Sequence, residues 1–177
     1  MSELSAQGPA IHSGATSVID STQMVKLGSR GFDVDGNGFV YVDFQQALAI
    51  GEWVSFNSAF AAIRLTSTAR GWVGVVVGTV SASDRFGWIQ VFGTNTFAWA
   101  SSDATTTFEA IIAATTDLGS ISTVSTSNDG ITVYGVHVAT APDTCASTAL
   151  STSALMAPCT VLLNYPFITG SMSVAST

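Results

Sequence analysis

Short apolar segments, separated by clusters of glycine, asparagine, aspartate and serine, run along most of this chain. In the clearest segment, residues 72–80, every residue is β-branched, aromatic or glycine, and none is charged. Such a composition is typical of a strand that is buried on both faces or packed against a second sheet. Polar turn sequence follows at 81–84, and residues 87–93 are again extended in pattern until Thr94-Asn95 interrupts them. This stretch therefore predicts a β-hairpin.

Another hairpin is predicted closer to the N-terminus. Residues 24–28 and 38–42 are apolar segments on either side of 33–37, where Asp-Gly and Asn-Gly occur in succession. These dipeptides tolerate the positive φ angles that tight hairpin turns require. Residues 52–56 and 60–66 predict two further strands.

The pattern after the central hairpin is less regular. Residues 96–100 predict a strand, whereas the apolar run 108–114 fits a helix or a buried strand equally well by pattern. The threonines before this run and the glycine after it favour a strand. Residues 120–127 and 131–138 flank Asn-Asp-Gly and predict a further hairpin.

The last predicted elements are a loop and a strand. Residues 141–158 are poor in charge and rich in serine, threonine and alanine, which indicates a long surface loop. Residues 161–163 predict the final strand, and we expect Pro166 to end it because proline cannot donate to a ladder. Three glycines in or beside predicted strands indicate bulges or close strand contacts: Gly78, Gly93 and Gly135.

Together these elements predict one all-β domain, a compact β-sandwich or barrel-like fold, over residues 26–168. The 177 residues are enough for one good core and too few for two, since domains usually have about 100–150 residues. Residues 1–25 carry scattered apolar side chains without a sustained period, so we expect an extended N-terminal arm that is disordered alone. Two interpretations of this arm stay open: a neighbouring subunit orders it, or it is a flexible terminus. Residues 169–177 are expected to be a C-terminal tail.

Composition and charge exclude several classes of partner. Only 10% of the residues are charged while 47% are hydrophobic, so serine and threonine must supply the polar surface of the strands. With one lysine, four arginines and a net charge of −7, the chain has no basic patch for nucleic acid, and its acidity repels anionic membrane headgroups. No apolar run reaches the roughly 18 residues of a membrane span. The first residues lack the basic and apolar regions of a signal peptide, which predicts synthesis in a cytoplasm.

Several motifs occur in an order that resembles a known family. The sequence G-V-V-x-G-T-V at 74–80, a short acidic turn and F-G-W-I-Q-V-F-G at 86–93 resemble the central hairpin of capsid decoration (cement) proteins of tailed bacteriophages. Three further matches, at 38–42, 49–54 and 161–168, lie in the same order, so that the resemblance covers roughly residues 25–168.

This resemblance implies a structural virion protein on the outer surface of a phage head. Such a protein binds the major capsid protein and stabilises contacts between neighbouring copies of it, and the family resemblance implies a homotrimer at threefold or quasi-threefold positions. Within this reading we expect the arm to contact the capsid through four apolar residues: Ile11, Val18, Ile19 and Met24. Two alternatives remain open at the sequence level. They are a head-fibre or tail-associated host-binding protein, and a free carbohydrate-binding β module.

No motif predicts catalysis, a cofactor or a metal site. Asp33-Val34-Asp35-Gly36-Asn37-Gly38 matches the opening of a calcium-binding loop, but Phe44 stands where that loop needs its bidentate glutamate. We therefore interpret the segment as a β-turn. No Gly-x-Ser-x-Gly elbow, phosphate-binding loop or dinucleotide fingerprint is present, so we expect the protein not to be an enzyme.

The remaining residues with chemical potential have plain structural interpretations. Neither His12 nor His137 has the paired spacing of a metal site. Cys145 and Cys159 form either two thiols or one bridge, and thiols are commoner in a chain made in the cytoplasm. The four tryptophans all lie in or beside predicted strands, which favours burial in the core or at a subunit interface over stacking on sugars: Trp53, Trp72, Trp88 and Trp99.

Overall fold

Eleven strands, joined edge to edge in one mixed sheet, make up the part of the chain that this computed structural model describes. The described residues are 16–66, 68–81, 84–101, 111–113, 119–123, 132–140 and 156–168. They contain no helix, so the predicted all-β class is confirmed, and none of them forms a helix that could cross a membrane. The strands are β1 (Ile19–Asp20), β2 (Arg30–Phe32), β3 (Gly38–Phe44), β4 (Trp53–Phe56), β5 (Ala61–Arg64), β6 (Gly71–Val76), β7 (Phe86–Ser101), β8 (Ile111–Ala113), β9 (Ile121–Thr123), β10 (Thr132–Val138) and β11 (Met156–Ile168).

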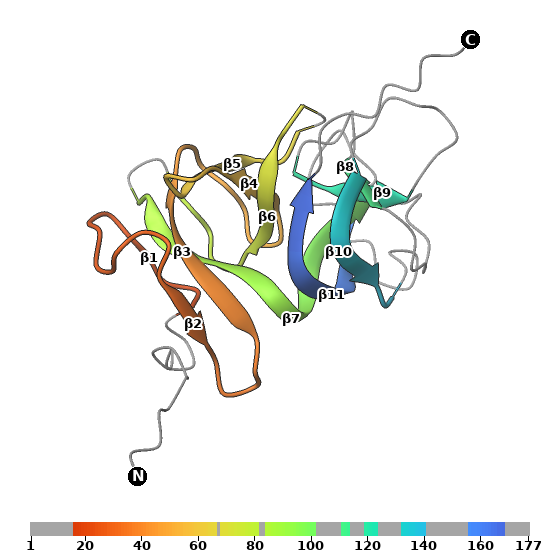
Figure 1. Cartoon of the computed structure of the whole chain (residues 1–177), viewed down its shortest axis with the longest axis horizontal. Helices are drawn as coiled ribbons and strands as arrows, with labels where there is room; N and C mark the ends of the chain where they lie inside the picture. Colours follow the sequence, from red (N-terminus) through yellow and green to blue (C-terminus); the bar gives the residue numbers. More distant parts are fainter. Residues whose placement is uncertain are drawn as a thin grey trace.

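The sheet closes on itself twice and so forms two small barrels that share β7 (Figure 1). The first barrel runs β3–β5–β4–β6–β7 and returns from β7 to β3. The second runs β7–β9–β8–β10–β11 and returns from β11 to β7. Because closure removes free sheet edges, most backbone N–H and C=O groups of the barrel strands have hydrogen-bond partners in a neighbouring strand.

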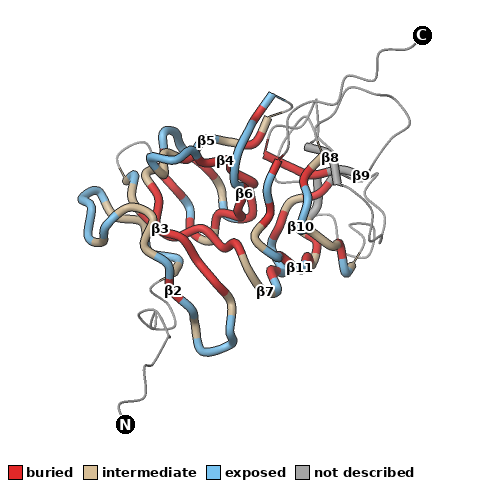
Figure 2. The backbone as a smooth tube through the Cα atoms, viewed as in Figure 1, coloured by how far each residue is buried: buried red, intermediate tan, exposed pale blue. Residues whose placement is uncertain are grey.

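Each barrel encloses its own apolar core, and the strands between the cores are buried on both faces (Figure 2). Val76 of β6 packs in the core of the first barrel, whereas Val73 and Val75 pack in the core of the second. On β4, Val54 belongs to the first core and Trp53 to the second. This double burial explains why residues 73–76 are apolar without alternation.

A third apolar cluster covers the outer face of β3 and β7. Phe39, Tyr41 and Trp88 are buried there, and the partly buried Val25 and Leu27 pack over them. Alternation along β3 therefore places one set of side chains in the barrel and the other set under the chain segment that precedes β2.

The structure confirms the central hairpin and corrects the end predicted for its second strand. β6 and β7 pair antiparallel, with Val75 opposite Gln90 and Val76 opposite Ile89. Thr94 and Asn95 do not interrupt β7, because β11 pairs with both of them. The Asn95 side chain is buried and donates to Gln90 Oε1 at 2.9 Å, so the polar residue is satisfied inside a continuous strand.

The hairpin predicted from 120–127 and 131–138 is wrong for the residues described. β9 and β10 are both strands, but β8 lies between them and pairs with each. The strand predicted at 108–114 is confirmed over Ile111–Ala113. In the sheet, β8 occupies the place beside β10 that β9 would occupy in a hairpin.

The final strand is longer than predicted at both ends. β11 begins at Met156, within the segment predicted to be a loop, and continues through Pro166 to Ile168. Its pairing with β7 stops at Asn164, and its pairing with β6 begins at Phe167. Pro166 therefore lies where β11 changes neighbour, so the missing N–H is tolerated at this point in the strand.

All three glycines have the predicted roles of a bulge or a close contact. A Cβ atom at Gly78 would lie 2.2 Å from the backbone oxygen of Ser17. Gly135 has a φ of +78° and lies at the register shift between Tyr134 and Val136. Gly93 has a φ of +90°, and a Cβ atom there would lie 2.2 Å from Asn37 Oδ1. All three positions therefore need glycine.

The N-terminal hairpin has the predicted turn but a later first strand. β2 begins at Arg30, and residues 24–28 are not a strand. The Asp33 carboxylate accepts hydrogen bonds from the backbone N–H groups of Asp35 and Asn37, and Asp33 N–H donates to Asn37 O at 3.0 Å. Residues 33–37 therefore form the β-turn that their composition predicts.

Candidate functional site

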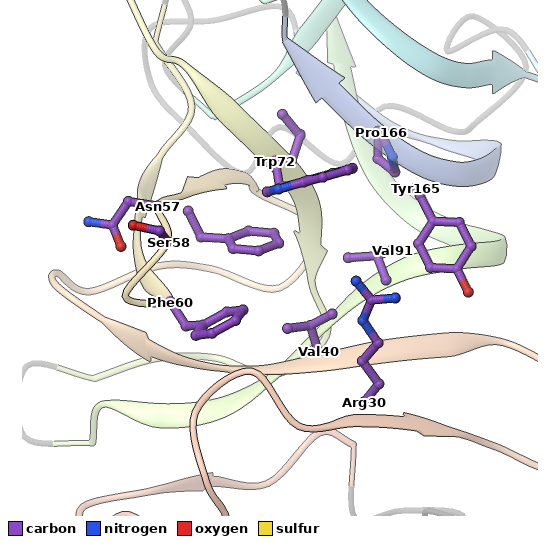
Figure 3. A pocket seen from close by; sticks show the side chains of 11 residues that line it. Arg30, Val40, Asn57, Ser58, Phe60, Trp72, Val91, Tyr165 and Pro166 are labelled. Atoms are coloured by element: carbon purple, nitrogen blue, oxygen red, sulfur yellow. The ribbon is translucent and has the colours of Figure 1, made fainter. Parts of the chain in front are cut away.

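A pocket of about 270 Å³ opens at one end of the first barrel (Figure 3). We call it the barrel mouth. Its interior is apolar, with Val40 and Val91 at the base, while Arg30 rises between Val91 and Tyr165 and the polar Asn57 and Ser58 lie on the opposite side. The lining residues are Arg30, Val40, Phe56, Asn57, Ser58, Phe60, Trp72, Val73, Val91, Tyr165 and Pro166.

Strand pairing explains why the barrel is open here. β6 pairs with β7 only through Val75 and Val76, and its first residues, Gly71 and Trp72, pair with β11 and β4 instead. The wall between Trp72 and Val91 therefore carries no ladder. The barrel mouth occupies this gap, which is a frequent place for a binding site in small barrels.

Two residues at the barrel mouth have an unusual backbone conformation. Phe60 has a φ of +60° and Tyr165 a φ of +49°, and within the described residues these are the non-glycine positions with positive φ. A bulky residue in this region costs roughly 1–3 kcal/mol and persists only where its surroundings enforce it. Phe60 stacks on Phe56 with ring centroids 6.2 Å apart, and Tyr165 stacks on Phe92 at 5.3 Å. Strain of this kind concentrates at functional sites, which marks the barrel mouth as a candidate.

Arg30 gives the barrel mouth a positive charge, and no acidic side chain among the described residues lies within ion-pair distance of it. Its guanidinium lies 5.7 Å from the centroid of the Tyr165 ring. By contrast, Arg64 pairs with Glu52 at 3.1 Å and Arg85 with Asp43 at 2.9 Å. None of the lining residues is acidic.

An exposed row of aromatic side chains continues from the barrel mouth across three neighbouring strands. Trp72 on β6 lies opposite Phe167 on β11, which lies opposite Tyr134 on β10. All three are exposed, Trp72 by 51%. The Trp72 and Phe167 rings meet edge to face at 6.2 Å, and Phe167 stacks on Tyr134 at 5.4 Å. We call these three residues the aromatic row; it is an unusual amount of apolar surface for adjacent exposed positions.

The structure separates the four residues predicted to contact a capsid. Ile11 lies outside the described residues. Val18 and Met24 are exposed, by 51% and 70%. Ile19 instead packs against the core of the first barrel, and its strand β1 pairs with β7 through Gly87. Part of the predicted arm, from residue 16 onward, thus lies on the barrel.

Tyr41 ties this N-terminal segment to the core. Met24 N–H donates to the Tyr41 phenol oxygen at 3.2 Å, and the Tyr41 ring packs edge to face on Trp88 at 5.1 Å. Burial raises the pKa of the Tyr41 phenol above its usual value of 10, since the charged form would lose its hydration.

The histidines, the cysteines and Asp33 do not form a metal site within the described residues. In the described ranges, no group of three or more His, Cys, Asp and Glu side chains is placed to hold a metal ion. His137 is half-buried on β10, Cys159 is buried in the core of the second barrel, and His12 and Cys145 lie outside the described residues. The Asp33 carboxylate also accepts from the Asn37 side chain at 2.9 Å, so its oxygens serve the turn.

The sequence pattern predicts burial in the core or at a subunit interface for all four tryptophans and does not identify the barrel mouth. Trp53 and Trp88 are buried and Trp99 is half-buried, while Trp72 is half-exposed at the barrel mouth. Neither Arg30 nor Tyr165 belongs to a recognisable sequence motif, and the two residues lie 135 positions apart in the sequence. One weak signal existed: Tyr165-Pro166-Phe167 places two aromatics around a proline at the end of an apolar run.

No family model, curated protein or solved structure matches this chain.

Proposed function

We propose that this protein is a capsid decoration protein of a tailed bacteriophage, which binds the outer surface of the head and stabilises contacts between major capsid proteins. The single observation that supports this most is the aromatic row, an exposed apolar surface on a rigid sheet that continues into the barrel mouth. The order of the motifs between residues 38 and 168 resembles that of decoration proteins, which act by binding another protein.

The geometry of the aromatic row favours a protein partner. A flat sugar platform needs rings that lie side by side with their faces free. Here Phe167 and Tyr134 are stacked at an interplanar angle of 22°, and Trp72 meets Phe167 at 62°, so the rings cover part of one another's faces. Tyr, Trp and Arg are the side chains that most often dominate binding energy between proteins.

The proposed mechanism is mass action. A ligand that binds the assembled shell and not its dissociated subunits shifts the equilibrium toward the shell. If three copies associate as the resemblance implies, simultaneous binding multiplies a modest affinity through high effective concentration. The net charge of −7 suits the outer face of a shell better than a face that touches DNA.

Shell binding tests the proposal directly. Undecorated shells of the major capsid protein are mixed with wild-type protein or with variants, and the bound copies are counted after sedimentation. We expect wild-type protein to bind at high copy number and Trp72→Ser/Phe167→Ser to lose most of that binding. Phe97→Ser is the matched control, since Phe97 is an exposed aromatic on β7 outside the aromatic row. Equal occupancy for the double variant, or no binding by wild-type protein, would contradict the proposal.

A second comparison addresses the N-terminal segment. Val18→Ser/Met24→Ser changes the two predicted contact residues that the structure leaves exposed. Reduced occupancy with an unchanged melting temperature would support their contact with the shell, whereas unchanged occupancy would remove them from the contact surface.

A free carbohydrate-binding module is the second candidate, because Trp72 is exposed at a pocket and Tyr134 is exposed at the other end of the aromatic row. Binding to a glycan array that is lost in Trp72→Ser, with no binding to shells, would favour this function instead.

A further inference from the structure

We infer that the barrel mouth is a docking pocket for one large apolar side chain that has a carboxylate beside it on a partner protein. This inference rests on the proposed function in that the partner is a protein, and it adds the chemistry by which that partner is recognised.

Size and polarity determine the apolar part of the ligand. The volume of about 270 Å³ lies just below the range of roughly 300–1,000 Å³ that is typical of small-molecule sites. It suits a single aromatic or branched aliphatic group. The base is formed by Val40 and Val91, and Phe56 and Phe60 belong to the lining.

The same lining disfavours a sugar ring. Each buried hydroxyl without a hydrogen-bond partner is costly, and only Arg30, Asn57 and Ser58 among the lining residues have polar side chains outside the aromatic class. A hydrocarbon group needs no such partners. Burial of a hydrocarbon group against the apolar side chains in Figure 3, such as Val40, Phe60 and Val91, is favourable.

Charge determines the second part of the ligand. Arg30 lies at the edge of the barrel mouth, makes no ion pair with the described residues, and has its guanidinium carbon 5.7 Å from the centroid of the Tyr165 ring. A guanidinium in this place can donate two parallel hydrogen bonds to a carboxylate. The lining contains no acidic residue, although the whole chain has a net charge of −7. The barrel mouth is therefore a place on this acidic protein where the local charge favours an anionic group.

The backbone indicates that the pocket is preformed. Phe60 and Tyr165 keep positive φ angles, and both are fixed by stacked aromatic neighbours. The Phe60 ring also occupies the space beside Gly28, where a Cβ atom would lie 2.2 Å from it. A site that is rigid before binding loses less entropy when it is filled.

The inference is tested on the isolated protein with three small probes. Phenylacetate carries an aromatic group and a carboxylate, phenylacetamide is its neutral counterpart, and acetate lacks the ring. Each is titrated against isotope-labelled protein by NMR, following the Trp72 indole N–H and the methyl groups of Val40 and Val91. We expect phenylacetate to shift these signals and to bind about tenfold more tightly than phenylacetamide, because a hydrogen bond to a charged group is worth about 1.5 kcal/mol. Acetate should leave them unchanged.

Matched variants assign the charge effect to one residue. Arg30→Gln should abolish the preference for phenylacetate over phenylacetamide, whereas Arg30→Lys should retain part of it. Arg70→Gln is the control, since Arg70 is exposed but lies outside the barrel mouth. A spectrum that is otherwise unchanged confirms that each variant is folded.

The outcomes separate this inference from the proposed function. Equal affinity for phenylacetate and phenylacetamide, no shift of the three reporters, or shifts caused by glucuronate or cellohexaose in place of phenylacetate would overturn the inference. Shell binding that persists in Arg30→Gln would also overturn it while leaving the decoration function intact. Probe binding with the expected preference, together with no binding to shells, would support the pocket and contradict the decoration function.

Discussion

Replacing Trp88 by alanine should destabilise the protein more than the same change at Trp72, although both residues lie in strongly apolar predicted strands. Trp88 is only 8% exposed, is buried with Phe39 and Tyr41 on the outer face of β3 and β7, and makes an edge-to-face contact with Tyr41 at 5.1 Å. Trp72 is 51% exposed and borders a pocket.

The magnitude follows from area and packing. Tryptophan buries about 150–250 Å², which at about 25 cal/mol per Å² gives about 4–6 kcal/mol as an upper bound. Large-to-alanine changes in cores cost about 3–5 kcal/mol. Val25 and Leu27 pack against the cluster that contains Trp88 and belong to a segment outside the barrels. Because partial collapse of such a segment reduces the cavity, we expect a loss at the low end of this range, about 3 kcal/mol, for Trp88→Ala. The expected loss for Trp72→Ala is about 1.5 kcal/mol, half of the loss for Trp88→Ala, because about half of the Trp72 surface is already in water.

Urea unfolding followed by far-UV circular dichroism measures both losses without depending on tryptophan fluorescence. In thermal melts, Trp88→Ala should lower the midpoint by about 6–12 °C. Equal losses for the two variants, or a loss below about 1 kcal/mol for Trp88→Ala, would refute the assignment of Trp88 to a buried cluster.

Three further predictions concern single positions. Gly93→Ala should cost more stability than Gly36→Ala, by about 1 kcal/mol or more, because both have positive φ but only Gly93 has an atom within 2.2 Å of the new Cβ; equal midpoints in urea would contradict this. The raised pKa of Tyr41 means that the folded state holds its proton more tightly than the unfolded state. Stability should therefore fall as the pH rises above about 10, and Tyr41→Phe should remove that part of the fall; parallel pH profiles for the two proteins would count against it. Glu52→Gln should lower the free energy of unfolding by about 1–3 kcal/mol, because the buried carboxylate pairs with Arg64, whose side chain is 31% exposed and thus partly screened. An unchanged free energy of unfolding would show that the ion pair does not stabilise the protein.

Local sequence was sufficient for most strands and for the turn at 33–37. Strands were predicted wherever β-branched and aromatic residues ran between turn residues, and Asp-Gly followed by Asn-Gly identified a turn that the structure contains. The fold class followed, because no segment had the period of a helix.

Strand boundaries failed where a distant neighbour decides them. Asn95 resembles a turn residue, but pairing with β11 keeps it extended and Gln90 satisfies its amide. Pro166 resembles a strand end, but β11 changes partner at this point and needs no donor there. β9 and β10 resemble a hairpin, but β8 supplies the hydrogen-bond partners of both.

The sequence by itself determined the all-β class, the acidity and the apolar strands, since these depend on residue type and on neighbours one or two positions away. Only the tertiary structure decided that the strands close into two barrels sharing β7, and that Arg30, Trp72 and Tyr165 meet at one opening. The reason is physical: pairing and burial are properties of contacts between residues far apart in the chain, and the same tryptophan is core or surface according to which strands close around it.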